Sequence, residues 1–373
     1  MTVSRARLLL LALVVLVPSL AVADDGLVGK TTVMPGTVYL ERTARGTSLT
    51  FELGFSVLKP CRPVVVTFKY LDADGEPLLY RRLVRHQLDA LASFVSVFDR
   101  QNKVRLHSTQ LSPGDFCFVS HPYSETPWAD KVPASVECVA YLVGTAGKTG
   151  GTARWNVKVN EYKPRTTFRL PVQGTWWHLE GHDAFSHHRQ IFSPQNTNYF
   201  ACDLVRVNEN LELPGSTLEE CLSYGEPILA AARGRVAKVQ DGIPDNPPGR
   251  RAEGFDAQKP ETAGGNIVLL DHGNDEFSYY AHLQPDSLKV KVGQLVQAGD
   301  VLGLCGNSGN SDTPHLHFHV VSAAVTHPLA APGLPAVFGE FELRQGTEWV
   351  TIRNRSILAG EIVRLPRAAA EED

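Results

Sequence analysis

The sequence lacks an excess of basic residues. Its 36 lysines and arginines are outnumbered by 40 aspartates and glutamates, which gives a formal net charge of -4 at pH 7. Nucleic acids and anionic membrane surfaces attract proteins through clustered positive charge. The composition therefore argues against binding to either partner. With 43% hydrophobic and 20% charged residues, the chain is instead typical of a folded, soluble protein.

Beyond its N-terminus, the sequence also lacks an apolar run long enough to cross a membrane. At the N-terminus, Arg5 and Arg7 precede an apolar run at residues 8–17, and small residues follow up to Ala23. This order is typical of a secretory signal peptide cleaved after Ala23, with an uncleaved anchor as the alternative. We therefore expect an exported protein, periplasmic or extracellular, without stable membrane insertion once residues 1–23 are removed.

Cysteine is scarce, and no Cys-x-x-Cys spacing occurs among the six cysteines, which argues against a cysteine-based zinc site. Export to an oxidising compartment instead predicts disulfides. The sequence leaves the connectivity open. A bridge between Cys202 and Cys221 is favoured, because the chain between them must double back from one strand to the next. One pair among Cys61, Cys117 and Cys138 is also expected.

Helical periodicity is nearly absent, and alternation of apolar with polar residues takes its place. Residues 49–57 and 64–70 alternate in this way, which predicts half-buried strands, and only residues 89–98 allow a helical turn or two. The length of 373 residues accommodates two domains and a tail. Several short strands separated by turn residues predict an immunoglobulin-like β-sandwich at residues 24–163.

A second β-rich domain is predicted at residues 164–345, before a tail at 346–373 with one or two strands. Its connections are too short for the long helices of a βαβ array, so the all-β chain should form an antiparallel sheet here. Residues 241–264, rich in proline and charge, predict an exposed, mobile loop. The segments expected to be strands are 199–205, 227–239, 265–271, 277–282, 289–292, 301–305 and 315–321.

Three histidines alternate with apolar residues directly after the glycine- and asparagine-rich loop 306–311. In a strand, His315, His317 and His319 would share one face, about 7 Å apart, while the residues between them point into the core. Such a face can bind one metal ion together with a histidine or carboxylate from elsewhere in the chain. The apolar residues of this alternation are Leu316, Phe318 and Val320.

Four segments in this region follow one another in an order that resembles a known family. They are Tyr-Ala-His-Leu at 280–283 and the segments 290–296, 303–309 and 315–318. The series resembles the lysostaphin-type (M23) zinc metallopeptidases of bacterial cell walls, and residues 227–236 resemble that family's first core hairpin. The resemblance covers roughly residues 176–321. It leaves the role of the N-terminal region open.

The resemblance implies a zinc site and two catalytic histidines. In this family zinc is bound by a His, an Asp and the second His of a His-x-His pair, which correspond here to His188, Asp203 and His317. His187 is the alternative to His188, because this His and Asp lie farther apart than in the family's commonest form. His315 and His282 match the positions that the family uses for catalysis.

The chemistry of these residue types is consistent with that assignment. Two imidazoles and one carboxylate leave a fourth tetrahedral position for water, whose pKa zinc lowers to about 7. The sequence lacks a His-Glu-x-x-His helix, whose glutamate would be the base, so His315 and His282 are expected to take the water proton and pass it to the leaving amine. His319 is expected to face solvent, with a role in orienting a neighbour as the alternative.

The resemblance implies an exported zinc metallo-endopeptidase that hydrolyses peptide cross-links of bacterial peptidoglycan. Which bond is cut, D-Ala to diaminopimelate or an oligoglycine bridge, stays open, as does the oligomeric state. The alternative is a non-catalytic wall-binding or hydrolase-regulating protein on the same fold. Relatives of that kind typically lack metal ligands, and all ligand positions can be filled here, which favours the enzyme. A third hypothesis makes the N-terminal sandwich the functional part, as an adhesion or docking module.

Overall fold

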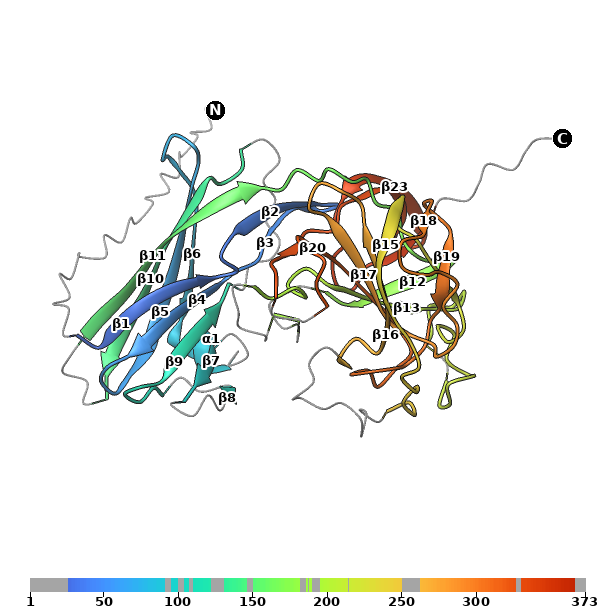
Figure 1. Cartoon of the computed structure of the whole chain (residues 1–373). Helices are drawn as coiled ribbons and strands as arrows, with labels where there is room; N and C mark the ends of the chain where they lie inside the picture. The colour runs from blue at the N-terminus through green and yellow to red at the C-terminus, as the bar shows by residue number, and fades with distance from the viewer. Residues whose placement is uncertain are drawn as a thin grey trace, which may run out of the picture.

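The chain folds into two β-rich lobes that lie side by side (Figure 1). Among the described residues, the single helix is α1 (Arg85–Ala90). No helix in this part of the chain is long and apolar enough to span a bilayer. The all-β prediction is therefore confirmed, whereas the signal segment lies outside the described residues. The computed structural model describes residues 26–90, 95–99, 104–106, 110–121, 131–145, 150–181, 186, 188–189, 195–213, 215–249, 262–326 and 330–365.

The N-terminal lobe consists of two sheets with a common core. Phe55 of one sheet contacts Trp155 of the other, with 6.1 Å between ring centroids. All strand pairings are antiparallel except that of β2 with β11. In spatial order, the first sheet contains β1 (Val28–Met34), β4 (Glu52–Val57), β9 (Phe116–Ser120), β7 (Val95–Phe98) and β8 (Val104–Leu106). The second contains β3 (Gly46–Leu49), β2 (Val38–Thr43), β11 (Gly150–Glu161), β10 (Ser135–Gly144), β5 (Cys61–Leu71) and β6 (Pro77–Val84).

The alternation in the sequence is what places these strands in a sandwich. Along β10 every second side chain is buried, because one face of the strand packs on the common core. The predicted helical turn at residues 89–98 is largely wrong. The helix ends at Ala90, and Val95 and Val97 belong to β7 because both side chains fill the core, with no exposed surface.

His121 is held in this core as a neutral imidazole. Its Nδ1 lies 3.1 Å from the carbonyl oxygen of Leu49 and its Nε2 lies 2.6 Å from the hydroxyl of Tyr70. Since the carbonyl can only accept, Nδ1 carries the proton and Nε2 accepts from the tyrosine. Burial, reinforced by the positive charge of Arg189, lowers the pKa of His121 to about 3.

We expect acid to destabilise the protein through His121. Between about pH 6.5 and about pH 3 the unfolded chain binds a proton on this residue that the folded chain does not bind. The free energy of unfolding should therefore fall with falling pH, by up to about 1.4 kcal/mol per pH unit from this group. In urea titrations at several pH values in this window, His121→Gln should show a shallower pH slope than wild type. The exposed His86→Gln should keep the wild-type slope, and an unchanged slope in His121→Gln would contradict the assignment.

The C-terminal lobe is built on one large sheet, and all strand pairings in this lobe are antiparallel, as predicted. In spatial order it contains β18 (Leu295–Val296), β15 (Gly234–Gln240), β16 (Asn266–Asp271), β17 (Phe277–Leu283), β20 (Leu316–Val321), β13 (Cys202–Arg206), β12 (Thr175–Glu180), β24 (Ile362–Arg364), β22 (Phe338–Gln345) and β23 (Glu348–Arg355). β21 (Gly333–Leu334) pairs with β20, and β14 (Pro227–Leu229) with β19 (Val301–Leu304). The strand expected at residues 289–292 is absent. In the structure these residues form a loop that ends in a turn.

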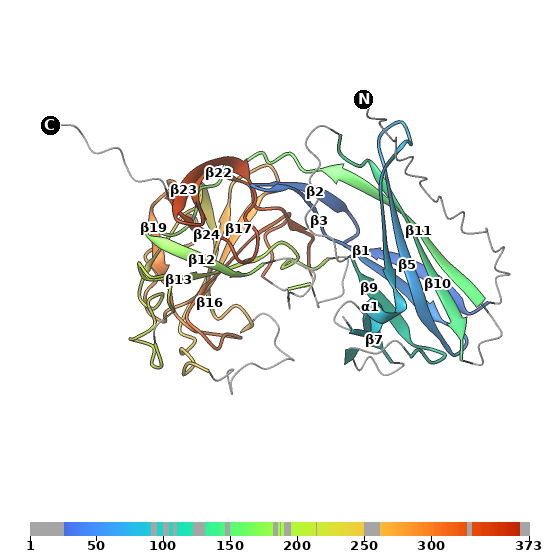
Figure 2. The same cartoon turned by 180° about the vertical axis from the view of Figure 1, so that it is seen from behind.

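The two lobes are joined by contacts far apart in the sequence as well as by the connector. The hairpin of β2 and β3 reaches the second lobe (Figure 2), where the Ser356 amide donates to the Arg42 carbonyl over 2.8 Å. The Tyr162 hydroxyl and the Arg165 amide both donate to Oε1 of Glu276, over 2.7 and 2.8 Å. The lobes thus share a hydrogen-bonded interface.

The six cysteines are free thiols in the structure, so it contains neither the disulfide expected between Cys202 and Cys221 nor the pair expected among Cys61, Cys117 and Cys138. The side chain of Cys202 points from β13 into the core of the second lobe. Cys221 lies instead in the bend and turn before β14 and is only half-buried. The doubling back of the chain between 202 and 221 therefore does not bring these two side chains together.

Candidate metal centre

The central strand β20 separates a packed face from a polar face, as its alternation predicts. Leu316, Phe318 and Val320 have no exposed surface and belong to the main core of the second lobe. The side chains of His317 and His319 line a pocket on the other face, together with His315 immediately before the strand. The sheet therefore supplies a rigid floor for three imidazoles.

Strand pairing brings a carboxylate to this floor. β13 and β20 are antiparallel neighbours, and in their register Asp203 lies directly opposite His317. Nδ1 of His317 is 2.9 Å from Oδ1 of Asp203. Because Cys202 and Leu204 point into the core, the alternation along β13 turns the carboxylate toward the pocket.

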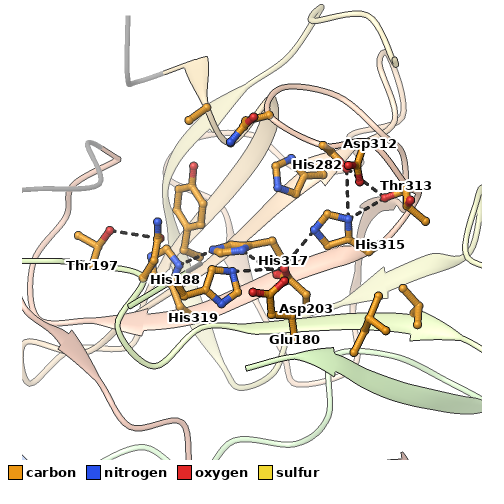
Figure 3. A pocket seen from close by; sticks show the side chains of 18 of the residues that line it. Glu180, His188, Thr197, Asp203, His282, Asp312, Thr313, His315, His317 and His319 are labelled. Carbon is orange, nitrogen blue, oxygen red and sulfur yellow. Dashed lines mark hydrogen bonds and ion pairs between the residues drawn. The ribbon is translucent and has the colours of Figure 1, made fainter. Parts of the chain in front are cut away.

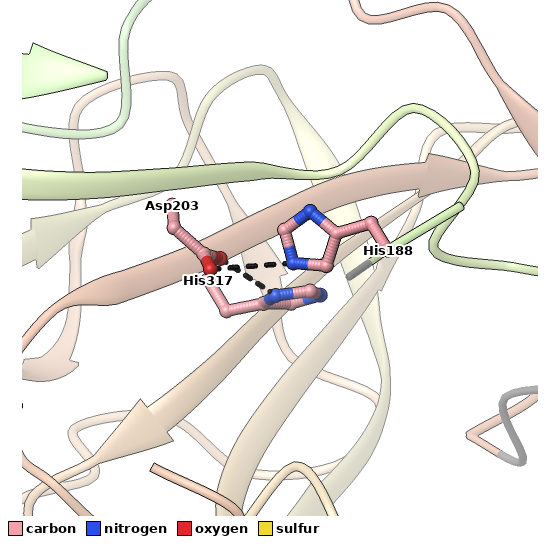
Figure 4. A group of neighbouring side chains, drawn as sticks. All are labelled: His188, Asp203 and His317. Atoms are coloured by element: carbon pink, nitrogen blue, oxygen red, sulfur yellow. Dashed lines mark hydrogen bonds and ion pairs between the residues drawn. The ribbon is translucent and has the colours of Figure 1, made fainter. Parts of the chain in front are cut away.

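The third side chain of the group, His188, comes from the connection between β12 and β13. Its Nε2 lies 3.2 Å from Oδ2 of Asp203, and its Nδ1 lies 3.1 Å from the carbonyl of Gly181. The backbone of His188 is held as well, since the side-chain amide of Asn196 donates to its carbonyl over 2.6 Å. His188, Asp203 and His317 each offer a ligand atom, and these atoms lie within 4.8 Å of one another (Figure 4). The alternative ligand, His187, lies outside the described residues.

The charge states of Asp203 and His317 suit a divalent metal ion. Burial alone would raise the pKa of Asp203, but the imidazoles of His188 and His315 hold that pKa well below its usual range, so the carboxylate is ionised. Burial lowers the pKa of His317 to about 4 against the opposing effect of Asp203, so its imidazole is neutral. Two imidazoles and one carboxylate converging on a point are a donor set typical of catalytic zinc. The residues present therefore fit the ion that the sequence implies.

Two further imidazoles face the same pocket. Nδ1 of His282 lies 2.7 Å from the carbonyl of Ser308, and Nδ1 of His315 lies 2.7 Å from the carbonyl of Thr313. Because a carbonyl only accepts, each Nδ1 carries a proton. Burial and the neighbouring imidazoles lower the pKa of His282 well below its usual range, so its Nε2 keeps a lone pair. The ring centroids of His282 and His315 are 4.7 Å apart, and Nε2 of His315 lies 3.6 Å from Oδ1 of Asp203 (Figure 3). Both imidazoles thus lie beside the His188–Asp203–His317 group.

The loop that supports these two histidines is fixed by residues from the segment 241–249. The side-chain amide of Asn246 donates to the carbonyls of Asn307, Gly309 and Ser311 over 2.8–2.9 Å. Asp245 accepts the amide of Asn307 over 2.7 Å. The expectation of an exposed, mobile loop at 241–264 is therefore wrong for residues 241–249, whereas residues 250–261 lie outside the described part of the chain.

His319 is buried, with 3% of its surface exposed, and the expectation that it faces solvent is wrong. Its Nδ1 lies 2.9 Å from Nε2 of His317, and its ring stacks on Tyr279 with 4.6 Å between centroids. A histidine that binds a metal through Nδ1 must carry its proton on Nε2 and donate it to an acceptor. His319 supplies this acceptor, so it orients His317. In the sequence, the position of His319 two residues after His317 indicated that it could orient this neighbour.

The pocket over the group has a volume of about 320 Å³. Its walls carry polar and acidic side chains from β12 and from the segments before β13 and β20, among them Glu180, Asn198, Asp312 and Thr313. Glu180 and Asn198, which the sequence did not single out, flank Asp203 on β12 and before β13. A cavity of this size next to a metal group accommodates a short segment of a peptide.

Comparison with known proteins supports the resemblance seen in the sequence. Residues 221–327 match Peptidase family M23, which confirms the resemblance to lysostaphin-type metallopeptidases for this segment. The matched range contains His282, His315 and His317. His188 and Asp203 precede it, and it is the pairing of β13 with β20 and the contact of His188 with Asp203 that add them to the site.

Three relatives show how far the similarity extends. The chain is 33% identical over 136 residues to an uncharacterized metalloprotease of Haemophilus influenzae, which covers 35% of this chain and 24% of the relative. It is 31% identical over 113 residues to the cell division protein DipM of Caulobacter vibrioides, which covers 30% and 15%. It is 42% identical over 57 residues to the peptidoglycan DD-endopeptidase ShyA of Vibrio cholerae, which covers 15% and 13%. The chain thus spans less than a quarter of the length of each relative.

Proposed function

We propose that this protein is an exported zinc metallo-endopeptidase that hydrolyses peptide cross-links of bacterial peptidoglycan. The observation that carries the proposal is the convergence of His188, Asp203 and His317 within 4.8 Å, at the floor of a pocket that also presents the imidazoles of His282 and His315. The match to Peptidase family M23 and the similarity to a peptidoglycan endopeptidase support the substrate class. Export is supported by the signal-like order of residues 1–23.

Nε2 of His188, a carboxylate oxygen of Asp203 and Nδ1 of His317 would hold the zinc ion. When bound there, zinc supplies a Lewis acid that polarises the peptide carbonyl and lowers the pKa of a water molecule. The side chains around the ligands fix the imidazoles in the required tautomers. Nδ1–H of His188 donates a hydrogen bond to the Gly181 carbonyl, and Nε2–H of His317 donates one to Nδ1 of His319.

The chain's own acid–base groups are His282 and His315. With their Nδ1 protons committed to the carbonyls of Ser308 and Thr313, the free Nε2 atoms accept the proton of the attacking water. The same Nε2 then returns that proton to the nitrogen of the leaving amine, so the proton count balances and the imidazole ends neutral. Burial and the neighbouring His315 and His317 keep the pKa of His282 well below its usual range, which keeps this imidazole unprotonated before the reaction.

The experiment that tests this function is incubation of the zinc-loaded protein, residues 24–373, with purified peptidoglycan, followed by mass spectrometry of the released fragments. We expect cross-linked muropeptides to disappear and their hydrolysed halves to accumulate, with one water added for each bond cut. His315→Ala should release nothing in parallel reactions. Cleavage confined to the sugar chains, or the same products from His315→Ala, would contradict the proposal.

A non-catalytic role in binding the wall or regulating another hydrolase is the second candidate. It is favoured by the similarity to the cell division protein DipM. The same incubation separates the two functions. A protein that sediments with peptidoglycan but leaves every cross-link intact would support the second candidate.

A further inference from the structure

A buried ion pair connects the N-terminal sandwich to the metal centre. Glu52, on β4 of the sandwich, and Arg189, in the second lobe, are each fully buried. Oε1 of Glu52 lies 2.7 Å from Nε and 2.6 Å from an Nη atom of Arg189. The Tyr199 hydroxyl donates to Oε2 of the same carboxylate. One carboxylate therefore binds two side chains of the other lobe.

The two side chains that Glu52 binds belong to the segments that carry the candidate ligands. Arg189 directly follows His188, and Tyr199 lies four residues before Asp203. The guanidinium of Arg189 also donates to the Phe51 carbonyl over 3.0 Å, so backbone and side chain of the sandwich hold it together. The contact thus reaches both ligand-bearing segments from outside their own lobe.

This outside support has a physical reason. Asp203 and His317 are fixed by the hydrogen bonds of paired strands, whereas the described residues between β12 and β13 include no strand or helix. The position of His188 therefore depends on individual contacts. The strongest of these is made by the next residue, Arg189, whose guanidinium forms two charge-assisted hydrogen bonds with the buried carboxylate of Glu52. Charges taken out of water in this way tolerate no loss of their partner, because the remaining charge is left buried and uncompensated. A displaced Arg189 would take the adjacent His188 with it.

We propose that Glu52 is a positioning residue of the metal centre: through Arg189 and Tyr199, the N-terminal sandwich holds His188 where it can share a metal ion with Asp203 and His317. The inference rests on the proposed function for the identity of the ion, zinc. It gives the sandwich a task that the peptidase resemblance does not assign. The sandwich then helps to position a metal ligand of the neighbouring lobe.

The test compares metal binding by the full chain and three variants. Glu52→Gln keeps the shape of the side chain and removes the charge that faces Arg189. Tyr199→Phe removes only the hydroxyl that reaches Glu52. Tyr162→Phe is the matched control, because it also removes a tyrosine hydroxyl from a glutamate between the lobes. That glutamate, Glu276, directly precedes β17 and is distant in sequence from His188 and Asp203. Near-ultraviolet circular dichroism first establishes that each metal-free variant is folded.

Co²⁺ is the probe, because its visible absorption reports the coordination geometry. We expect Glu52→Gln to weaken Co²⁺ binding about 10–100-fold and to alter the absorption bands, as loss of an outer partner of a ligand does. Tyr199→Phe should weaken it by a smaller factor, on the order of threefold. Tyr162→Phe should bind Co²⁺ as wild type does. Hydrogen exchange of the metal-free protein should be faster around residues 186–189 in Glu52→Gln and unchanged there in Tyr162→Phe.

A folded Glu52→Gln variant with wild-type Co²⁺ affinity, spectrum and exchange would overturn the inference, and so would equal effects of Tyr199→Phe and Tyr162→Phe. Should Glu52→Gln not fold, the two tyrosine variants decide between these outcomes. The result is separable from the proposed function. Loosened exchange around His188 in a protein that never cuts peptidoglycan would refute the function alone, whereas unchanged metal binding in an active enzyme would refute the positioning role alone.

Discussion

Asp203→Asn is expected to abolish both zinc binding and peptide hydrolysis. The carboxylate of Asp203 lies between the two candidate ligand imidazoles, 2.9 Å from Nδ1 of His317 and 3.2 Å from Nε2 of His188. The amide that replaces it has the same shape but no negative charge, so two neutral imidazoles would be left to hold a divalent cation. The loss of affinity should exceed the roughly 10–100-fold that follows from removing an outer partner of a ligand. Zinc per chain after dialysis, measured by plasma mass spectrometry, gives the result.

Asp312→Asn is the control for this experiment. Asp312 lines the same pocket and is exposed, so its replacement removes a nearby negative charge without removing a ligand. The control should retain about one zinc per chain. Retention of zinc by Asp203→Asn, or equal loss by the two variants, would show that general electrostatics of the pocket and not ligation by Asp203 holds the ion.

His315→Ala is expected to stop hydrolysis while zinc stays bound. His315 faces the ligand group from the edge of the pocket, and its Nε2 is 3.6 Å from Oδ1 of Asp203, but it does not belong to the convergent His188–Asp203–His317 group. Removal of a general base typically lowers kcat about 10²–10⁴-fold. Steady-state hydrolysis of a cross-linked muropeptide and the zinc content of the same preparation should therefore diverge. His282→Ala should behave alike, because its imidazole lies beside that of His315.

The division of roles between ligands and proton carriers depends on this divergence. The metal-depleted Asp203→Asn variant serves as the reference for activity lost together with zinc. If His315→Ala loses zinc to the same extent, His315 is a ligand and the proposed assignment is wrong. If it keeps both zinc and full activity, the imidazole that moves the proton is another one.

The parts of the site that depend on local alternation could be predicted from the sequence. His315, His317 and His319 share a face because strands have a period of two, and Leu316 and Phe318 are buried for the same reason. The sequence resemblance proposed Asp203 as a ligand, and the alternation along β13 turns its side chain away from the core that Cys202 and Leu204 enter. None of these inferences required knowledge of which strands pair.

The parts that depend on distant contacts could not be predicted. Glu52 and Arg189 are 137 residues apart, and a glutamate at the start of an apolar strand gives no sign of the arginine that pairs with it. The burial of His319 depends on Tyr279, which reaches it through the pairing of β17 with β20. Residues 289–292, expected as a strand, form a loop in the structure. An alternation over only four residues does not distinguish a strand from a loop that packs against the core.

The convergence of the three ligands is tested most directly by the anomalous scattering of zinc in crystals of the full chain. The account predicts one peak at the zinc absorption edge, with Nε2 of His188, an oxygen of Asp203 and Nδ1 of His317 each at about 2.0–2.2 Å. A peak coordinated by other residues, or a zinc-soaked crystal with no peak between β13 and β20, would contradict it.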